Sequence, residues 1–215
     1  MGFCTKNPAN PTLGSVRVGS APDYSTCSWT YENSTGEAAS FSAGGSIDLS
    51  ESYASAPATG TYPYAVMIIS KDFNIKGKFG PVGGKTYYST TTFQTSSTDS
   101  DDYATQVAPL NTFGGDEECV AYTEGEVVTD GTISAYLINS SGILLDSDST
   151  ITECSGQEKL LGVMKMSSDL TISDATKGLK MTFTVTNNGM SVVTNEAGSD
   201  IYVDSGPFSV KFETF

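Results

Sequence analysis

Apolar and polar residues alternate with a period of two through much of this chain, and that pattern limits what the chain can fold into. Clear examples are residues 46–50, 73–79, 181–185 and 208–212. Such alternation is typical of β-strands that bury one face and expose the other. Glycines and β-branched residues interrupt every longer stretch that could form a helix. We therefore expect an all-β protein.

Turn signals between these runs predict how some of the strands connect. The Asn-Gly pair at 188–189 separates the run 181–185 from the run 190–193. Asn-Gly fits the two positive φ angles of a tight hairpin turn, so these runs are expected to pair. Residues 132–139 and 143–145 predict a second hairpin, because a Ser-Ser-Gly turn lies between them.

Three further segments complete the expected elements. Residues 62–70 are apolar on both faces after Pro63, which predicts a strand in the middle of a sheet. Residues 157–166 have the composition of a short helix, although Gly162 fits it poorly. Residues 173–178 begin with a capping serine and end in glycine, which is enough for one helical turn.

Many short strands with frequent turns indicate a two-layered all-β fold. We expect an antiparallel β-sandwich, jelly-roll or immunoglobulin-like, in which one domain spans residues 1–215. A long acidic loop rich in Ser and Thr is expected near 95–118. The same stretch has the composition of a linker between two smaller domains, which is the alternative organisation.

Four cysteines stand at Cys4, Cys27, Cys119 and Cys154. No two of them form a C-x-x-C pair and the chain has no histidine, so a structural zinc site is not expected. Of the three possible pairings we favour sequence neighbours, Cys4 with Cys27 and Cys119 with Cys154. Disulfides predict export to an oxidising compartment, whereas four reduced thiols would indicate a cytosolic protein.

Charge and hydropathy restrict the partners. The net charge is −14, and the 11 basic residues form no patch, so nucleic acid and anionic membranes are not expected as partners. No apolar run approaches the ~18 residues that cross a bilayer, so membrane insertion is not expected either. Residues 1–4 lack the charged start and apolar centre of a signal peptide, and we expect that a processed signal preceded them.

The absence of histidine also limits catalysis. It removes Ser-His-Asp and Cys-His constellations and the commonest general base at neutral pH. Glu124 and Glu126 share a strand face, but 25 acidic residues make such spacing common by chance. We expect that the protein is not an enzyme.

Calcium is the most credible ligand, because hard oxygen donors gather in two expected loops. No fixed cofactor is expected, and neither loop matches an EF-hand, so solvated acidic loops are the ordinary interpretation. A third acidic run, 116–118, has the same character. The weak calcium candidates are Asp99, Asp101, Asp102, Asp146 and Asp148.

Carbohydrate is a second possible partner, because the chain has 11 tyrosines. Tyr62 and Tyr64 share one strand face, whereas the pair 87–88 divides between two faces. Trp29 stands two residues after Cys27, a spacing that favours packing on a disulfide over exposure to sugars. Two N-glycosylation sequons, at Asn33 and Asn139, carry little information in a chain so rich in hydroxyl residues.

One passage carries a resemblance to a known group. Residues 59–70, TGTYPYAVMIIS, followed by FNIKG at 73–77, resemble a segment of uncharacterised exported β-sandwich proteins of marine bacteria. The likeness covers less than a tenth of the chain, and its motif is a buried strand followed by an alternating one. The resemblance implies export and a β-sandwich, and it lends no activity and no functional residues.

The sequence therefore predicts a secreted or cell-surface structural protein, the subunit of a filament, surface coat or virion. Copies of itself are the expected partners, with a terminal strand, 13–18 or 208–215, completing a neighbour's sheet. Pairing of those strands within their own sheet is the competing interpretation. The alternative function is a calcium- or carbohydrate-binding module.

Overall fold

A computed structural model of the chain describes residues 1–9, 18–40, 52, 54–114, 118–184, 190–194, 201–205 and 209–215. Within these residues the protein is almost entirely antiparallel β-structure with two short 3-10 helices. The chain divides into two compact units. Unit 1 comprises Met1–Lys71, Asn111–Thr182 and Val210–Phe215, and unit 2 comprises Asp72–Leu110 and Phe183–Ser209. The prediction of a single domain stays a prediction.

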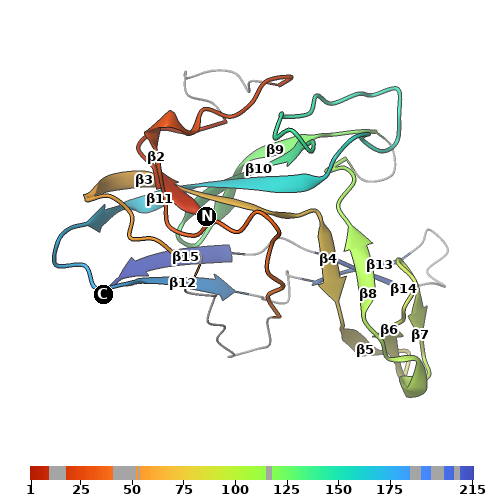
Figure 1. Ribbon diagram of the computed structural model, residues 1–215. Coiled ribbons are helices and arrows are strands. Elements are labelled where there is room, and N and C mark those ends of the chain that lie inside the picture. Colours follow the sequence, from red (N-terminus) through yellow and green to blue (C-terminus); the bar gives the residue numbers. More distant parts are fainter. Residues whose placement is uncertain are drawn as a thin grey trace. The chain divides into compact units, whose positions relative to one another are not determined.

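Unit 1 is built on a six-stranded antiparallel sheet with the strand order β2-β1-β3-β11-β10-β9 (Figure 1). The long strand β3 lies between β1 and β11, as its apolar faces predicted. The strands are β1 (Gly2–Cys4), β2 (Cys27–Trp29), β3 (Gly60–Ser70), β9 (Tyr122–Val128), β10 (Gly131–Ile138) and β11 (Lys159–Ile172), and the 3-10 helix η1 (Tyr24–Thr26) precedes β2.

One face of this sheet carries the main core cluster. Val66 of β3 lies opposite Val163 of β11, so their side chains share that face. Each such aliphatic side chain contributes about 1.5–3 kcal/mol to the free energy of unfolding when it is fully buried. The buried members of the cluster are Cys4, Ala9, Val66, Tyr136, Ile138, Leu144, Leu161 and Val163.

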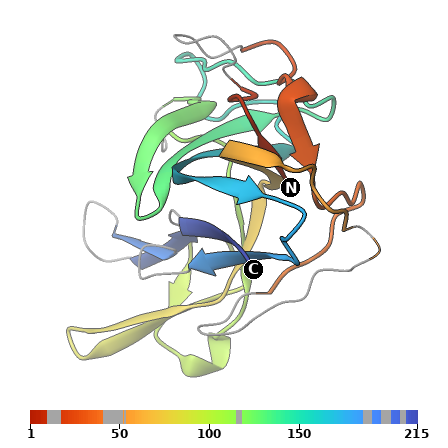
Figure 2. The same cartoon turned by 90° about the vertical axis from the view of Figure 1, so that its left-hand side faces the viewer.

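A two-stranded ribbon lies on one side of the six-stranded sheet (Figure 2). It pairs β12 (Leu179–Thr184) with β15 (Ser209–Thr214), the last strand of the chain. The Phe212 ring of β15 packs edge-on against the Phe3 ring of β1, with centroids 5.3 Å apart. The ribbon and the sheet therefore form the two layers of an open β-sandwich, which confirms the predicted fold class.

Both disulfides join the predicted partners. Cys4 and Cys27 face each other across β1 and β2. Cys119 is bonded to Cys154, and the β9–β10 hairpin lies between them in the chain. No free cysteine remains.

Unit 2 contains small sheets. One pairs β4 with β8, a second has the order β5-β6-β7, and a third pairs β13 with β14. Its elements are β4 (Asp72–Ile75), β5 (Lys78–Val82), β6 (Lys85–Ser89), β7 (Ser96–Ser97), the 3-10 helix η3 (Ser100–Asp102), β8 (Gln106–Pro109), β13 (Met190–Thr194) and β14 (Ile201–Ser205). The expected loop near 95–118 therefore contains three short elements, β7, η3 and β8. The run 106–109 forms a strand because β4 supplies it with a partner.

Three expected elements differ from the structure. The run 157–166 is not a helix but the first part of β11, which lies between β3 and β10. The Asn-Gly signal at 188–189 does not join paired strands, since β12 pairs with β15 and β13 with β14. The predicted strand 73–79 is divided between β4 and β5. In each case, tertiary pairing outweighs a local preference.

Two other predictions concern segments that the structure does not describe. The expected strand 46–50 and the turn 187–189 lie outside the described residues.

The predicted hairpin around 140–142 does form, with an isolated bridge between Ile138 and Leu144.

Candidate functional site

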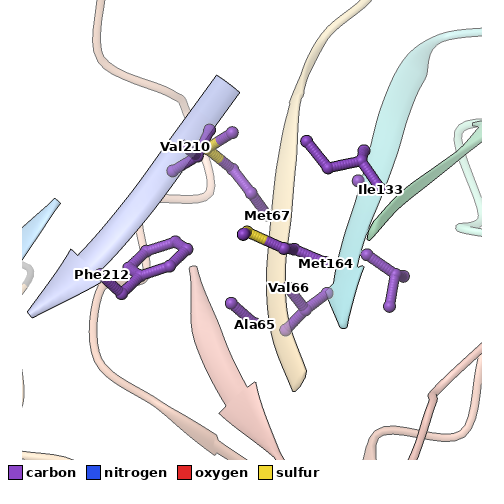
Figure 3. A pocket seen from close by; sticks show the side chains of 9 residues that line it. Ala65, Val66, Met67, Ile133, Met164, Val210 and Phe212 are labelled. Atoms are coloured by element: carbon purple, nitrogen blue, oxygen red, sulfur yellow. The ribbon is translucent and has the colours of Figure 1, made fainter. Parts of the chain in front are cut away.

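An apolar pocket of about 50 Å³ lies between the six-stranded sheet and β15 (Figure 3). Met67 of β3 and Met164 of β11 point into it, and Val210 and Phe212 of β15 face them. Alternation explains part of the apolar lining, because Ala65 and Met67 of β3 and Gly162 and Met164 of β11 lie on the same face of the sheet. The complete lining is Ala65, Val66, Met67, Ile133, Gly162, Val163, Met164, Val210 and Phe212.

A second pocket of about 170 Å³ is lined in part by the same Met164 and Phe212. Its other lining residues are Asp130, Met166, Ser167, Ser168 and Lys211. We call the two pockets together the β15 groove, which thus has an apolar part and a polar mouth.

The polar mouth forms where β11 departs from regular pairing. The register between β11 and β3 shifts between Lys165 and Leu170. The amide of Ser167 instead donates a hydrogen bond to the carbonyl of Asp130, at 2.9 Å. This bulge turns polar residues of β11 toward the groove.

The charge at the mouth is fixed by an ion pair on β15. The Lys211 ammonium lies 2.8 Å from the Glu213 carboxylate. Glu213, and to a smaller extent Asp130, raises the pKa of Lys211 above its ordinary value. Lys211 lowers the pKa of Glu213 in return, so both groups are charged at neutral pH.

Three methionines give the groove an adaptable lining. Met164 and Met166 stand two residues apart on β11, and Met67 lies on β3. Met164 and Met166 are only 5% and 8% exposed, so these flexible, polarizable side chains fill irregular space between the two layers. The sequence shows this spacing, but only the pairing of β3 with β11 brings the three side chains together.

β15 also has an edge suited to a further strand. It is paired with β12 on one side, and no other described strand pairs with it. Its sequence, SVKFET, contains no proline or glycine that would interrupt pairing. Its two charged side chains, Lys211 and Glu213, form an ion pair with each other, so the strand carries no net charge. An edge with these properties is a good template for strand addition.

The edge strand β9 is a poor template by comparison. It carries Glu124, Glu126 and a bulge near Gly125, whose φ is +74°. Charged side chains and bulges are common devices that prevent edge-to-edge pairing. Val127, at 84% exposed, is its one large apolar residue open to solvent.

The edge strands β5 and β2 are also unsuited to pairing. β5 contains Pro81, which has no N–H, and a register shift between Phe79 and Val82. β2 is only three residues long. Of the edges of β2, β5, β9 and β15, that of β15 therefore has the fewest obstacles to an added strand.

Two of the three calcium candidates of unit 2, Asp99 and Asp102, accept local hydrogen bonds, and Asp101 takes part through its backbone amide. The Asp99 carboxylate accepts a hydrogen bond from the amide of Asp101 at 2.9 Å, which caps η3. The Asp102 carboxylate accepts one from the Ser97 hydroxyl at 2.6 Å. These bonds explain the acidic cluster by local capping.

The candidates of unit 1 behave similarly. Asp146 accepts from the amide of Ser147, and Asp148 accepts from both the amide and the hydroxyl of Thr150. The two bonds from Thr150 lower the pKa of Asp148. Within the described residues, no group of three or more His, Cys, Asp or Glu is placed to hold a metal ion. Residues 116 and 117 of the third acidic run lie outside that part of the chain.

Calcium binding by these loops stays a prediction with a simple test. Millimolar calcium should raise the melting temperature by several degrees if any acidic loop binds it, because a ligand that binds only the folded state stabilises that state. Equal melting temperatures in calcium and in chelator would exclude a site.

The tyrosines suggested for sugar stacking occupy different environments. Tyr62 is 5% exposed, and its hydroxyl donates to the carbonyl of Ala58. Tyr64 and Trp29 pack against the core cluster that contains Cys4. These three residues therefore serve the core, as expected for Trp29.

The carboxylates singled out for catalysis are also separated. The Glu124 carboxylate accepts from the Tyr136 hydroxyl at 2.8 Å, whereas Glu126 accepts from Thr123 at 3.1 Å. The register shift in β9 falls between Thr123 and Glu126, so Glu124 lies within the bulge and Glu126 is paired opposite Ile133. The prediction that the protein is not an enzyme stays a prediction.

Comparison with known proteins identifies no protein that is similar to this chain. No protein-family model matches the chain, and neither a curated protein nor a solved structure matches it. The resemblance of residues 59–77 to exported proteins of marine bacteria stays a prediction. In the described part of the chain, no helix is long and apolar enough to cross a membrane.

Proposed function

We propose that this protein is an exported structural subunit that assembles with copies of itself by strand addition at β15. Two disulfides support export, because such bonds persist in oxidising compartments. A surface rich in hydroxyl and carboxylate groups suits the same environment. Filament, surface coat and virion remain the assemblies that such a subunit fits.

One observation carries this proposal: among the residues that the structure describes, the second layer of the sandwich has two strands, whereas the layer that it covers has six. The β15 groove lies between the two layers, beside a strand with a free edge. A strand added to β15 would continue the short layer and place alternate side chains over the methionines.

A second copy is the proposed donor, and β15 is its proposed attachment point, since the edges of β2, β5 and β9 are less suited to pairing. The groove takes apolar side chains, and alternating strands are abundant in the chain itself. The net charge of −14 makes copies repel one another. Association should therefore strengthen with ionic strength, since salt screens repulsion between exposed charges.

The test fills the groove without disturbing the backbone. A Cβ added at Gly162 would meet only the Met67 carbonyl oxygen, at 3.8 Å, and Gly162 lines the apolar pocket. We expect Gly162→Val to prevent association. It should also raise the free energy of unfolding by about 0.5–1 kcal/mol, because a strand glycine is replaced. Sedimentation velocity over rising protein and salt concentrations measures association, and urea unfolding measures stability.

Val127→Thr is the matched control, since it changes the exposed residue of the β9 edge and leaves the groove intact. We expect this variant to assemble like the natural chain. A natural chain that stays monomeric at every salt concentration refutes self-assembly. Loss of assembly in Val127→Thr with normal assembly in Gly162→Val would place the contact at β9 instead.

A carbohydrate-binding module is the second candidate, supported by aromatic side chains of unit 2. The Tyr88 and Tyr103 rings lie 5.4 Å apart, and Lys76 Nζ lies 4.5 Å from the Tyr103 centroid. Phe79, 41% exposed, is paired opposite Tyr87. A glycan array probed with the natural chain and with Tyr87→Ala tests this candidate. Equal, background-level signals from both would exclude it.

A further inference from the structure

Asn33 begins an exposed turn of unit 1 that has a specific side-chain geometry. Its Oδ1 accepts a hydrogen bond from the Thr35 amide at 3.1 Å and one from the Thr35 hydroxyl at 2.8 Å. The Gly36 amide donates to the Asn33 carbonyl at 3.2 Å, which closes the turn. Asn33-Ser34-Thr35 is also a glycosylation sequon, so the sequon residues contact each other directly.

The surroundings of this turn leave space for a large substituent. Asn33 is half-buried, and every residue from 34 to 40 is exposed. The Tyr31 hydroxyl donates to the Glu37 carboxylate, which joins the chain before the turn to the chain after it. The turn is thus held by its own residues.

The other sequon, at Asn139, forms a similar turn, because Asn139 is also half-buried and its carbonyl accepts from the Gly142 amide at 2.9 Å. It differs in the partners of its side chain. Its Oδ1 accepts from the amides of Ser141 and Ile143, at 2.9 and 3.0 Å. The next residue, Leu144, is 1% exposed and belongs to the core cluster. The hydrogen bonds of Asn139 hold the turn that brings Leu144 into the core, so a glycan on Asn139 would disturb the packing of Leu144.

We propose that the folded, exported protein carries an N-linked glycan on Asn33 and none on Asn139. This proposal rests on the exported location within the proposed function, and not on self-assembly. The donor is an oligosaccharide linked through a diphosphate to a lipid, transferred by a secretory-pathway transferase. A bond forms between Asn33 Nδ2 and C1 of the first sugar, and the bond from C1 to the diphosphate oxygen breaks. The lipid diphosphate leaves with the electron pair of the broken bond, and the proton lost by the amide is taken up by the departing diphosphate.

The local geometry favours this reaction at Asn33. The hydroxyl of Thr35 donates to Oδ1, which polarises the side-chain amide and promotes loss of the Nδ2 proton. Because the contact requires the hydroxyl at the third position, Thr35→Ala should abolish modification, whereas Ser34→Ala should leave it intact. Residues 34–40 of the turn are exposed, so a glycan on Asn33 can extend into solvent.

The experiment expresses the full chain behind a secretory leader in eukaryotic cells. Disulfide-bonded protein is collected from the medium and from the lumen of the secretory pathway together. Glycans are released enzymatically in heavy-oxygen water, which marks each formerly modified Asn as a labelled Asp in the peptide mass spectrum. We expect the label on residue 33 alone and its loss in Asn33→Gln and in Thr35→Ala.

Two controls separate the possible outcomes. Asn139→Gln should leave the glycan unchanged, and Asn33→Gln should unfold at a slightly lower temperature than the natural chain produced without glycan, because it loses the two hydrogen bonds that Asn33 Oδ1 accepts. Disulfide-bonded protein with an unmodified Asn33 overturns the inference, as does label on Asn139. Neither result bears on assembly, which is measured on unglycosylated protein.

Discussion

Burial of two tyrosine hydroxyls gives individual residues a measurable influence on stability. Tyr24 packs against Trp29 with ring centroids 5.2 Å apart, and its burial raises its pKa to about 12. Tyr136 is 1% exposed. Burial, and then the hydrogen bond to Glu124, raises the pKa of Tyr136 further above its ordinary value.

The sign of the resulting pH dependence follows from linkage. Above pH ~10 the unfolded chain ionises these tyrosines while the folded chain keeps them protonated, so the unfolded state binds fewer protons. The free energy of unfolding should therefore fall as the pH rises from about 10 toward 12. Urea midpoints at several alkaline pH values measure the decline. It should be shallower in Tyr24→Phe and in Tyr136→Phe, and an equal decline in all three proteins would contradict this explanation.

Two glycines of the β9–β10 region provide a second residue-scale prediction. A Cβ at Gly131, whose φ is +154°, would lie 2.1 Å from the Lys165 carbonyl oxygen. A Cβ at Gly125, whose φ is +74°, would meet nothing within 4 Å. We expect Gly131→Ala to cost about 2–4 kcal/mol and Gly125→Ala about 1–2 kcal/mol of unfolding free energy, measured in urea. A larger loss in Gly125→Ala would show that the turn between the strands is wrongly described.

At the residue scale the sequence predicted pairing better than site chemistry. Both disulfides join the expected cysteines because cysteines close in the chain meet at the lowest entropic cost. The acidic clusters looked like ligand sites, yet Asp99 and Asp148 are used to cap turns. Composition alone cannot tell these uses apart, because both require the same carboxylates in loops.

At the scale of the element, each disulfide closes a loop that the unfolded chain would otherwise leave open. The bonded cysteines are separated by 23 residues in Cys4–Cys27 and by 35 in Cys119–Cys154. Replacing either pair by alanine should lower the free energy of unfolding by about 3–4 kcal/mol on the chain-entropy account. Urea unfolding of the two double variants measures the loss. A loss below about 1 kcal/mol would mean that the bond constrains little of the unfolded state.

The strand with apolar residues on both faces was predicted well, whereas partners inferred from turn signals were right around 140–142 and wrong at 188–189. Residues 62–70 form β3 because apolar side chains on both faces suit the middle of a sheet. The Asn-Gly signal misassigned the partner of β12, because a turn preference is worth less than burying the β12–β15 ribbon against a sheet. The short-helix interpretation of 157–166 failed for a related reason, since Gly162 and its neighbours pair on both sides within β11.

At the scale of the whole molecule, alternation predicts two-layered β-structure but not how many strands each layer holds. The β15 groove lies where the described part of unit 1 sets two strands against six. Its lining comes from β3, β10, β11 and β15, which lie far apart in the chain. No local pattern could have placed Met67, Met164 and Phe212 together, so the site became visible only with the sheet order.

Amide hydrogen exchange across a concentration series tests strand addition most directly, because an added strand must bond to backbone groups at the free edge of β15. We predict that amides of residues 210–214 gain protection as the protein assembles in high salt. Gly162→Val should show no such gain at any concentration. Assembly that leaves these amides unprotected, or that protects the amides of β9 instead, would contradict the account.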